Sequence, residues 1–352
     1  MCNSDVLYRM PAEWEPHEGT WLQWPHDGTV LPDGSVVSGY RDEIEDIWVR
    51  IATELHRGEN VHILVNGDAE KAHVEEKLSE SNVDFSKIDF LSVEIDDIWM
   101  RDNGPIFVRD RQGGLLITEW NFNGWGGRYP SEADAGVPVH IGKKTGIPVL
   151  TADICIEGGG IEVDGKGSLM ASKTSIINDN RNPQKSQREI EASLSKHLGI
   201  TNFVWISGLR GEDNNNEVTD FHIDGSARFS ERGAILYKTD PYGEAAPYLL
   251  EAFERHYGEL RAARDAGGNP YKLIPVPMTR KNIKGLSYKG SYLNYYIGNE
   301  VVLVPVWGDA HDALGLSIIE GQFPGRRVAG IYVCDLYKYG GAIHCVTQQQ
   351  PR

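Results

Sequence analysis

The chain has 352 residues, a formal net charge of −16 at pH 7 and a hydrophobic content of 40%. This length and apolar content suffice for one large domain or two ordinary ones. The acidic balance argues against a nucleic-acid partner, because no basic stripe is available to neutralise phosphates, and it suits a cationic small molecule.

Neither a targeting segment nor a membrane segment is expected. The N-terminal stretch lacks a basic flank followed by an apolar run, and no apolar run approaches the ~20 residues of a transmembrane helix. The cysteines show no Cys-x-x-Cys spacing, which argues against a zinc site or a disulfide framework; they are Cys2, Cys155, Cys334 and Cys345. We therefore expect a reduced, cytoplasmic protein.

A unit of strand, turn, strand, helix and strand recurs about five times along the chain, at roughly 45 residues per copy. The first copy runs from GTWLQWP (19–25) through a helix over 41–58 to NVHILV (60–65). Its helix has apolar residues at helical spacing, which predicts one buried stripe; these are Ile44, Ile47, Trp48, Ile51 and Leu55. Gly58 is expected to end it, and a further helix at 67–81 is an addition.

The second and third copies follow the same order. PIFVRDRQGGLLITEW (105–120) predicts a hairpin with Gly113 and Gly114 in its turn, followed by a short helix near 135–145 and by GIPVL. GSLMASKTSIIN (167–178) opens the third copy, and a helix and NFVWIS complete it. The apolar face of that helix is predicted to contain Ile190, Leu194 and Leu198.

The fourth copy combines SARFSERGAILYKT (226–239), a helix and YKLIPVPM (271–278). The fifth combines YLNYYIGNEVVLVPVWG (292–308), a helix and VAGIYVC (328–334). Apolar residues that indicate the two helices are Leu249, Leu250, Phe253 and Tyr257 in the fourth copy and Leu314 and Ile318 in the fifth.

The repeats predict an α/β fold that is not a purely parallel sheet, because strands joined by tight turns must run antiparallel. Units that cannot bury their faces alone gain a common core by closing around an axis. We therefore predict a five-bladed α/β propeller. No linker is visible, so residues 1–352 are expected to form one domain.

The polar motifs fall between the repeated units. IDDIWMRDNGP (95–105) precedes the second unit and contains Asp102; CIEGGGIEV (155–163) precedes the third and contains Glu157. TDFHIDGSARF (219–229) precedes the fourth unit, and GGAIHCVTQQQP (340–351) follows the fifth. If the ring closes, these segments converge and bring together the three carboxylates, one imidazole and one thiol of Asp102, Glu157, Asp224, His222 and Cys345.

This set of groups predicts hydrolysis at the central carbon of a guanidinium. Paired carboxylates accept directional hydrogen bonds from that planar cation. Carboxylates alone would raise the pKa of a neighbouring thiol, but a bound cation reverses the effect and stabilises the thiolate when attack is needed. The imidazole can protonate the departing amine and later activate water, so we expect a covalent thiouronium intermediate.

Five stretches together resemble the agmatine deiminase and bacterial-type peptidylarginine deiminase family over nearly the whole chain. They are MPAEWEPHEGTWLQWP, IWMRDNGPIFV, EGGGIEVDGKG, HIDGSARF and GGAIHCVTQQQP. The resemblance implies the propeller of guanidine-modifying enzymes, with no metal and no organic cofactor. It further implies that Cys345 is the nucleophile and His222 the general acid and base. Asp102 and Asp224 would hold the guanidinium nitrogens, and Glu157 would assist the substrate and His222.

The resemblance also bears on the substrate. Agmatine is expected because the chain ends directly after QQQP, as in the short family members, and a homodimer is possible. Family members commonly have glycine before the motif histidine, where this chain has Phe221. Trp99 and Trp125 are candidate walls for the aliphatic tail, and Asp220 and Asp213 are weaker candidates for its terminal ammonium.

Other interpretations remain open at this point. Free or peptidyl arginine is an alternative substrate, and the pocket would then need an arginine or backbone amides for its carboxylate. A metallohydrolase with the same His and carboxylates as ligands, or a non-catalytic binding propeller, is a further alternative. Singly, Cys345 can be a buried apolar residue, and Asp102 or Glu157 a turn residue. The other histidines, including His344, are expected to be structural or on the surface.

Overall fold

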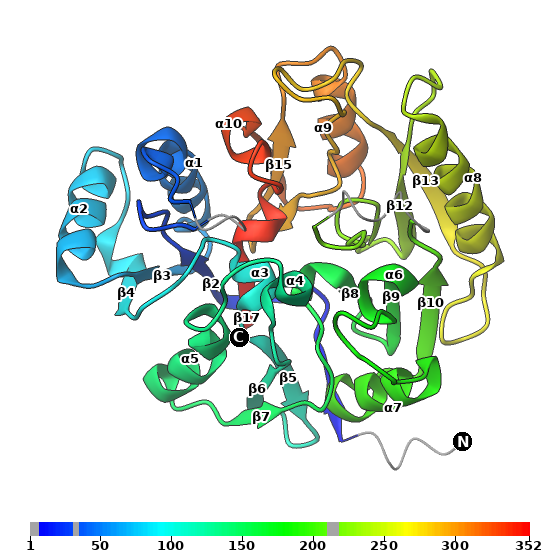
Figure 1. The fold of residues 1–352 in the computed structure, drawn as a ribbon, viewed down its shortest axis with the longest axis horizontal. Coiled ribbons are helices and arrows are strands. Elements are labelled where there is room, and N and C mark those ends of the chain that lie inside the picture. Colours follow the sequence, from blue (N-terminus) through cyan, green and yellow to red (C-terminus); the bar gives the residue numbers. More distant parts are fainter. Residues whose placement is uncertain (1–6, 31–34, 210–217) are drawn as a thin grey trace.

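Five small sheets and their helices surround a common centre in the computed structural model (Figure 1). The structure describes residues 7–30, 35–209 and 218–352. Cys2, Asp213 and residues 212–217, whose sequence EDNNNE predicts an exposed loop, lie outside the described residues. The predicted five-bladed α/β propeller is confirmed.

Blades two to five each consist of two antiparallel strands, a helical crossover and a third, parallel strand, as the repeats predicted. Blade two contains β5 (Ile106–Asp110), β6 (Leu115–Glu119), α5 (Val137–Thr145) and β7 (Val149–Thr151). Blade three contains β8 (Ile161–Val163), β9 (Ser168–Ser172), α6 (Lys173–Ile176), α7 (Gln187–Leu198) and β10 (Asn202–Ile206).

The fourth and fifth blades repeat this arrangement. Blade four contains β11 (Ala227–Phe229), β12 (Ala234–Thr239), α8 (Pro247–Ala262) and β13 (Lys272–Pro277). Blade five contains β14 (Tyr296–Ile297), β15 (Val301–Val306), α9 (Asp312–Glu320) and β16 (Arg327–Tyr332), followed by α10 (Cys334–Tyr337).

Blade one differs because its antiparallel strand comes from the other end of the chain. The C-terminal strand β17 (Gln348–Pro351) pairs antiparallel with β2, in the sheet order β17-β2-β3-β4. The rest of the blade is β2 (His17–Gln23), α1 (Tyr40–Leu55), β3 (Asn60–Val65), the added α2 (Asp68–Ser79) and β4 (Ile88–Ser92). The short β1 (Tyr8–Arg9) joins blade two beside β5. Both ends of the described chain are thus held in sheets.

Local sequence explains where several helices begin and end. Ser186 and Glu189 form a capping box before α7, in which each side chain bonds the other residue's backbone N–H, and Gly199 ends that helix at a φ of 75°. The buried stripe predicted for α1 is present. In α8 the buried residues are Ala252, His256 and Leu260, whereas Tyr257 is exposed.

Apolar side chains pack between neighbouring blades rather than around the central axis. One core joins α1 and β3 of blade one to the strands of blade five, and it includes Trp99 and Trp125. Other cores join blades two and three, three and four, and one and two. The axis is therefore left to the polar segments that connect the blades.

Candidate active site

Each of the five candidate catalytic residues lies just before the first strand of a blade. Asp102 is in α3 (Met100–Asn103) before β5, and Glu157 precedes the 3₁₀ helix η3 (Gly158–Gly160) and β8. His222 and Asp224 precede β11, and Cys345 lies in the 3₁₀ helix η5 (His344–Val346) before β17. The label of α3 lies near the centre of the ring in Figure 1, close to the red C-terminal segment. The ring closure by β17 thus fixes the position of the thiol.

His222 lies between two carboxylates. Its Nε2 is 3.1 Å from Oε2 of Glu157, and its Nδ1 is 3.7 Å from Oδ1 of Asp102. Burial alone would lower the pKa of His222, but the charge of Asp102 and the hydrogen bond to Glu157 raise it to about 9. The imidazole is therefore protonated near neutral pH and can donate a proton to a leaving group.

The carboxyl of Asp102 is held by two donors. The backbone N–H of Gly159 bonds its Oδ1 at 3.0 Å, and Nε1 of Trp125 bonds its Oδ2 at 2.9 Å. Burial raises the pKa of Asp102 to about 6, an effect that the charge of His222 opposes and that Glu157 and Asp224 reinforce. A cation bound beside Asp102 would favour its ionised form.

Cys345 and Asp224 are joined through Asn294. Nδ2 of Asn294 lies 3.1 Å from Oδ2 of Asp224 and 3.3 Å from Sγ of Cys345, and Sγ lies 3.9 Å from Oδ2. Burial and then the charges of Asp224 and Asp102 raise the pKa of the Cys345 thiol well above its usual value. The free site therefore holds a thiol, and a cationic ligand is needed to favour the thiolate.

Two of the three glycines after Glu157, Gly158 and Gly159, are required by close packing. A Cβ on Gly159 would lie 2.7 Å from both Oδ1 of Asp102 and Nδ1 of His222, and 3.1 Å from Oδ2 of Asp224. A Cβ on Gly158 would lie 2.1 Å from the backbone oxygen of Arg101. Asp102, His222 and Asp224 therefore converge on Gly159, where any side chain would clash with them.

The two candidate tryptophans contact different parts of this site. A hypothetical Cβ on Gly341 would lie 2.3 Å from the indole of Trp99 and 3.0 Å from Cβ of Cys345. Trp99 therefore packs against the segment that contains Cys345. Trp125 has a φ of 55° and reaches Asp102 through Nε1. Its ring makes edge contacts with Phe122 and Tyr129. Trp125 therefore contacts an acid of the site as well as its surrounding core.

Asp220 is already bound by protein side chains. It accepts from Arg128 at 2.7 and 3.0 Å and from Asn180 at 3.0 Å, and it also bonds Arg181. The role of Asp220 as a partner of the substrate ammonium stays a prediction, and these contacts make it unattractive. Asp213, the other candidate, lies outside the described residues.

The backbone conformation at Phe221 is one that suits the glycine of the family pattern better than a phenylalanine. Its φ is 76°, a left-handed conformation in which glycine is unstrained and other residues are not. The phenyl ring is buried in the core between blades three and four, with His256 at a centroid distance of 5.1 Å. Its direct effect is thus on the backbone before His222.

Four further residues support the site and were not identified from the sequence. His344 lies 2.8 Å from Oδ2 of Asp224 through Nδ1 and 2.8 Å from Oε2 of Glu13 through Nε2. Nε of Arg181 donates to Oε1 of Glu157 at 2.8 Å. Asn294 could have been found from the repeats, because it precedes β14 as the other site residues precede their strands. His344, Glu13 and Arg181 carry no comparable signal.

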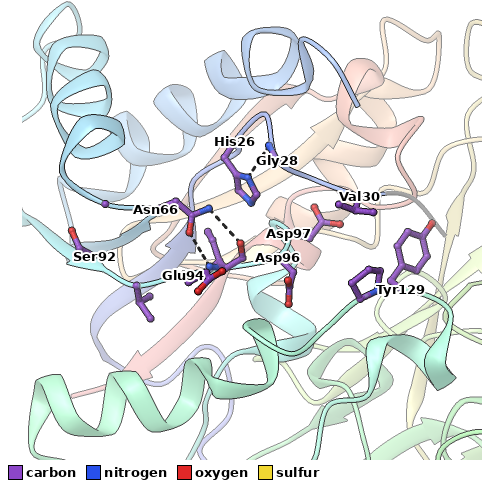
Figure 2. Close-up of a pocket in the computed structure, with 13 residues that line it drawn as sticks. His26, Gly28, Val30, Asn66, Ser92, Glu94, Asp96, Asp97 and Tyr129 are labelled. Carbon is purple, nitrogen blue, oxygen red and sulfur yellow. Dashed lines mark hydrogen bonds between the residues drawn. The ribbon is translucent and has the colours of Figure 1, made fainter. Parts of the chain in front are cut away.

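An acidic cavity of about 590 Å³ has His26, Asn66 and Tyr129 in its lining (Figure 2). Its lining includes Glu94, Asp96 and Asp97 but none of the five candidate catalytic residues. Oδ2 of Asp97 accepts a hydrogen bond from Nε1 of Trp99 at 2.9 Å. The indole of Trp99 thus connects the wall of this cavity to the segment that contains Cys345.

Residues 7–30, 35–209 and 218–352 contain neither a candidate metal site nor a candidate membrane span. Within these ranges, no three His, Cys, Asp or Glu side chains are placed to hold a metal ion. Across the same part of the chain, no helix is both long enough and apolar enough to cross a bilayer.

Comparisons with known proteins identify the family. Residues 9–351 match the model of the Porphyromonas-type peptidyl-arginine deiminase family. A Streptomyces coelicolor protein is 35% identical over 99% of this chain and 100% of its own length. A Pseudomonas aeruginosa protein named agmatine deiminase is 32% identical over 98% of this chain and 95% of its own.

A solved structure agrees with this assignment. The agmatine deiminase of Enterococcus faecalis, described as catalysing its reaction, superposes with a TM-score of 0.86 at 26% identity. The superposition covers 99% of this chain and 97% of that one. The shared fold and sequence define a guanidino hydrolase. The chain belongs to the Porphyromonas-type peptidyl-arginine deiminase family, and the resemblance seen in its five motifs is confirmed.

Proposed function

We propose that this enzyme hydrolyses agmatine to N-carbamoylputrescine and ammonia, with Cys345 as the nucleophile. The observation that carries the proposal is the contact between Cys345 and Asp224, together with the convergence of Asp102, His222 and Asp224 around Gly159. Two carboxylates there match the two nitrogen edges of a guanidinium, and the thiol is adjacent. The relatives named agmatine deiminase support this choice of substrate.

In the first step, the bound guanidinium favours the thiolate of Cys345, which forms a bond to the central carbon. The carbon–nitrogen bond to one terminal amino group breaks, and His222 protonates that group so that it leaves as ammonia. The proton released by the thiol is taken up by the departing ammonia, and His222 is left neutral. The product of this step is a positively charged thiouronium on Cys345.

In the second step, water attacks the same carbon, and the carbon–sulfur bond breaks to regenerate the thiol and release the ureido product. His222, which is neutral after the first step, accepts one proton of the attacking water, and the other proton of the water returns to the sulfur. Glu157 orients His222 in both steps through its contact of 3.1 Å. Asp102 and Asp224 are assigned to the guanidinium nitrogens throughout.

Charge near the site favours agmatine over arginine, the alternative substrate. Arginine brings a carboxylate, which needs an uncommitted cation or backbone amides in the pocket. Arg128 pairs with Asp220, and Arg181 pairs with Asp220 and Glu157, so these two cations are matched by two carboxylates. The wall of the cavity in Figure 2 is acidic, with Asp96 and Asp97 in its lining. An ammonium tail fits these surroundings better than a carboxylate does.

A substrate comparison with a thiol variant tests the proposal. Purified enzyme is incubated with agmatine, free arginine and an N-blocked arginine peptide, and ammonia and ureido product are measured. Agmatine should be turned over, and Cys345→Ala should lose activity by about 10³-fold or more. Cys155→Ala is the matched control, because Cys155 is buried outside this group of residues. Turnover of the peptide with agmatine inert would reject the substrate.

Inhibitors distinguish the metallohydrolase alternative. Iodoacetamide should inactivate the enzyme by alkylating Cys345, and a chelator should leave it active; the reverse pattern would contradict the thiol mechanism. Three other expectations join the proposal. The pairing of β17 with β2 supports one domain over residues 1–352, and the cytoplasmic location and the homodimer stay predictions.

A further inference from the structure

Arg181 links two acidic residues that belong to different segments of the site. Its side chain is fully buried in the loop between α6 and α7. Nε donates to Oε1 of Glu157 at 2.8 Å, while Nη1 bonds Oδ2 of Asp220. The same guanidinium therefore ties the segment that contains Glu157 to the segment that contains His222.

The Asp220 end of this link is held from several sides. Arg128 binds both carboxylate oxygens of Asp220, and Asn180 binds one of them. The hydroxyl of Thr174 donates to the backbone oxygen of Asp220 at 2.8 Å. Because Asp220 is fixed in this way, Arg181 is directed toward Glu157 rather than left to choose another rotamer.

The backbone at this point is strained. Asp220 and Phe221 have φ values of 55° and 76°, so two consecutive residues other than glycine adopt the left-handed conformation directly before His222. The hydroxyl of Ser172 donates a hydrogen bond to the backbone oxygen of Phe221 at 2.6 Å. The surrounding hydrogen bonds thus hold a turn that the sequence alone does not favour.

The electrostatic consequence reaches His222 through Glu157. Burial would raise the pKa of Glu157, but the hydrogen bond from His222 and the charge of Arg181 lower it. The charged groups that raise the pKa of His222 are Asp102, Glu157 and Asp224. Loss of Arg181 would remove one of the groups that keep Glu157 ionised, so His222 would lose part of its support.

We propose that Arg181 and Asp220 form a positioning pair that keeps Glu157 ionised and directed at His222, so that His222 stays protonated for transfer to the leaving amine. The pair acts through Glu157, and neither residue is assigned to contact the substrate. The inference rests on the proposed function only in giving His222 the role of proton donor. It also assigns Asp220 a task other than binding the substrate ammonium.

The first test compares kinetics of two Arg181 variants. Arg181→Met removes both the charge and the hydrogen bonds, and we expect kcat for agmatine to fall by about 100-fold. KM should change by less than about 3-fold, because the guanidinium contacts are kept. Arg181→Lys keeps the charge but cannot bond both acids in the same way, so a loss of about 10-fold is expected.

The deciding measurement does not need turnover. In the Cys345→Ala background, the His222 ring is titrated by NMR, and its signal is identified by its absence in His222→Asn. The pKa of His222 should fall from about 9 toward its usual value in Arg181→Met, and by less in Arg181→Lys. An unchanged titration in Arg181→Met would overturn the proposal, even if activity were lost.

Two further variants keep the test decisive. Arg128→Met is the matched control, because Arg128 binds Asp220 but is not bonded to Glu157; it should shift the His222 titration less than Arg181→Met does. If Arg181→Met fails to fold, Asp220→Asn serves in its place, with a smaller shift in the same direction. A full shift in Arg128→Met, or none in Asp220→Asn, would contradict the positioning pair. The titration of His222 needs no substrate, so its result does not depend on whether agmatine is the substrate of this enzyme.

Discussion

Sγ of Cys345 lies 3.9 Å from Oδ2 of Asp224, so the candidate nucleophile faces a carboxylate. A negative charge at this distance disfavours the thiolate, and two unit charges 4 Å apart interact by about 4 kcal/mol at an effective dielectric of 20. The same carboxylate attracts a guanidinium. The site therefore favours a reactive thiolate only when its cationic substrate is bound.

Neutralising Asp224 should make the free thiol more reactive while abolishing turnover. In Asp224→Asn the pKa of Cys345 should fall, because burial remains but the nearest negative charge is gone. We expect alkylation of Cys345 by iodoacetamide at pH 8 to become about 10-fold faster, measured by mass spectrometry of its peptide. Asp46→Asn, at an exposed position of α1, is the control and should react at the wild-type rate. Slower alkylation in Asp224→Asn would contradict this account of the thiol.

The pH dependence of kcat/KM should be bell-shaped. Asp102 must be ionised to hold the guanidinium, so activity should rise as pH increases through about 6. His222 must be protonated to donate to ammonia, so activity should fall as pH increases through about 9. A stopped or continuous ammonia assay between pH 5 and 10 measures both limbs. A single limb near the usual histidine value would show that His222 does not act as assigned.

Trp125→Phe should move one limb only. The indole N–H of Trp125 donates to Oδ2 of Asp102 and lowers the pKa of that carboxyl, against the larger effect of burial. Phenylalanine keeps most of the ring contacts but has no donor, so the acidic limb should move to higher pH. The alkaline limb should stay near 9, and it serves as the internal control. A shift of both limbs would indicate a general distortion instead.

Phe221→Gly should cost less stability than a matched change elsewhere. Removing a buried phenyl group costs about 3–5 kcal/mol, but at Phe221 glycine also relieves a left-handed backbone strain of about 1–3 kcal/mol. Phe229, buried in β11 with no positive φ, is the control. Phe221→Gly should therefore be roughly 2 kcal/mol less destabilising than Phe229→Gly in urea unfolding. Equal losses would show that the strain at Phe221 is negligible.

Asp134→Asn should stabilise the protein at alkaline pH. Burial and the charge of Asp97 raise the pKa of Asp134 to about 8, so the folded state keeps a proton that the unfolded state has lost above about 4. The free energy of unfolding therefore falls as pH rises from about 4 to 8. Asparagine keeps an acceptor for Gln23, which donates to Oδ1 at 2.9 Å. We expect a gain of roughly 1–3 kcal/mol at pH 8 and little change at pH 4.5.

The repeats determined most of the fold because their signals are local. The stripe from Ile44 to Leu55 in α1 and the Gly113–Gly114 turn of blade two depend on residues a few positions apart, which the sequence displays directly. Counting the units predicted the five blades. The strand pairing that closes the ring was not evident, because β17 and β2 lie at opposite ends of the chain and pair only in the folded protein.

The same distinction applies to the site. The order of motifs selected Asp102, Glu157, His222, Asp224 and Cys345 as candidates, since each precedes a strand or follows a complete unit. Only the tertiary structure showed which groups support them. His344 bonds Asp224, which lies 120 positions away in the sequence, and Arg181 bonds both Asp220 and Glu157.

By itself, the sequence determined the repeated blades, the candidate catalytic groups and the expected chemistry, because periodicity and motifs are read from neighbouring residues. The tertiary structure alone decided the ionisation of those groups, since the pKa of Cys345 or His222 depends on burial and on charges that distant segments contribute. It also decided the conformation of Phe221, because hydrogen bonds and packing hold a backbone that a phenylalanine does not prefer.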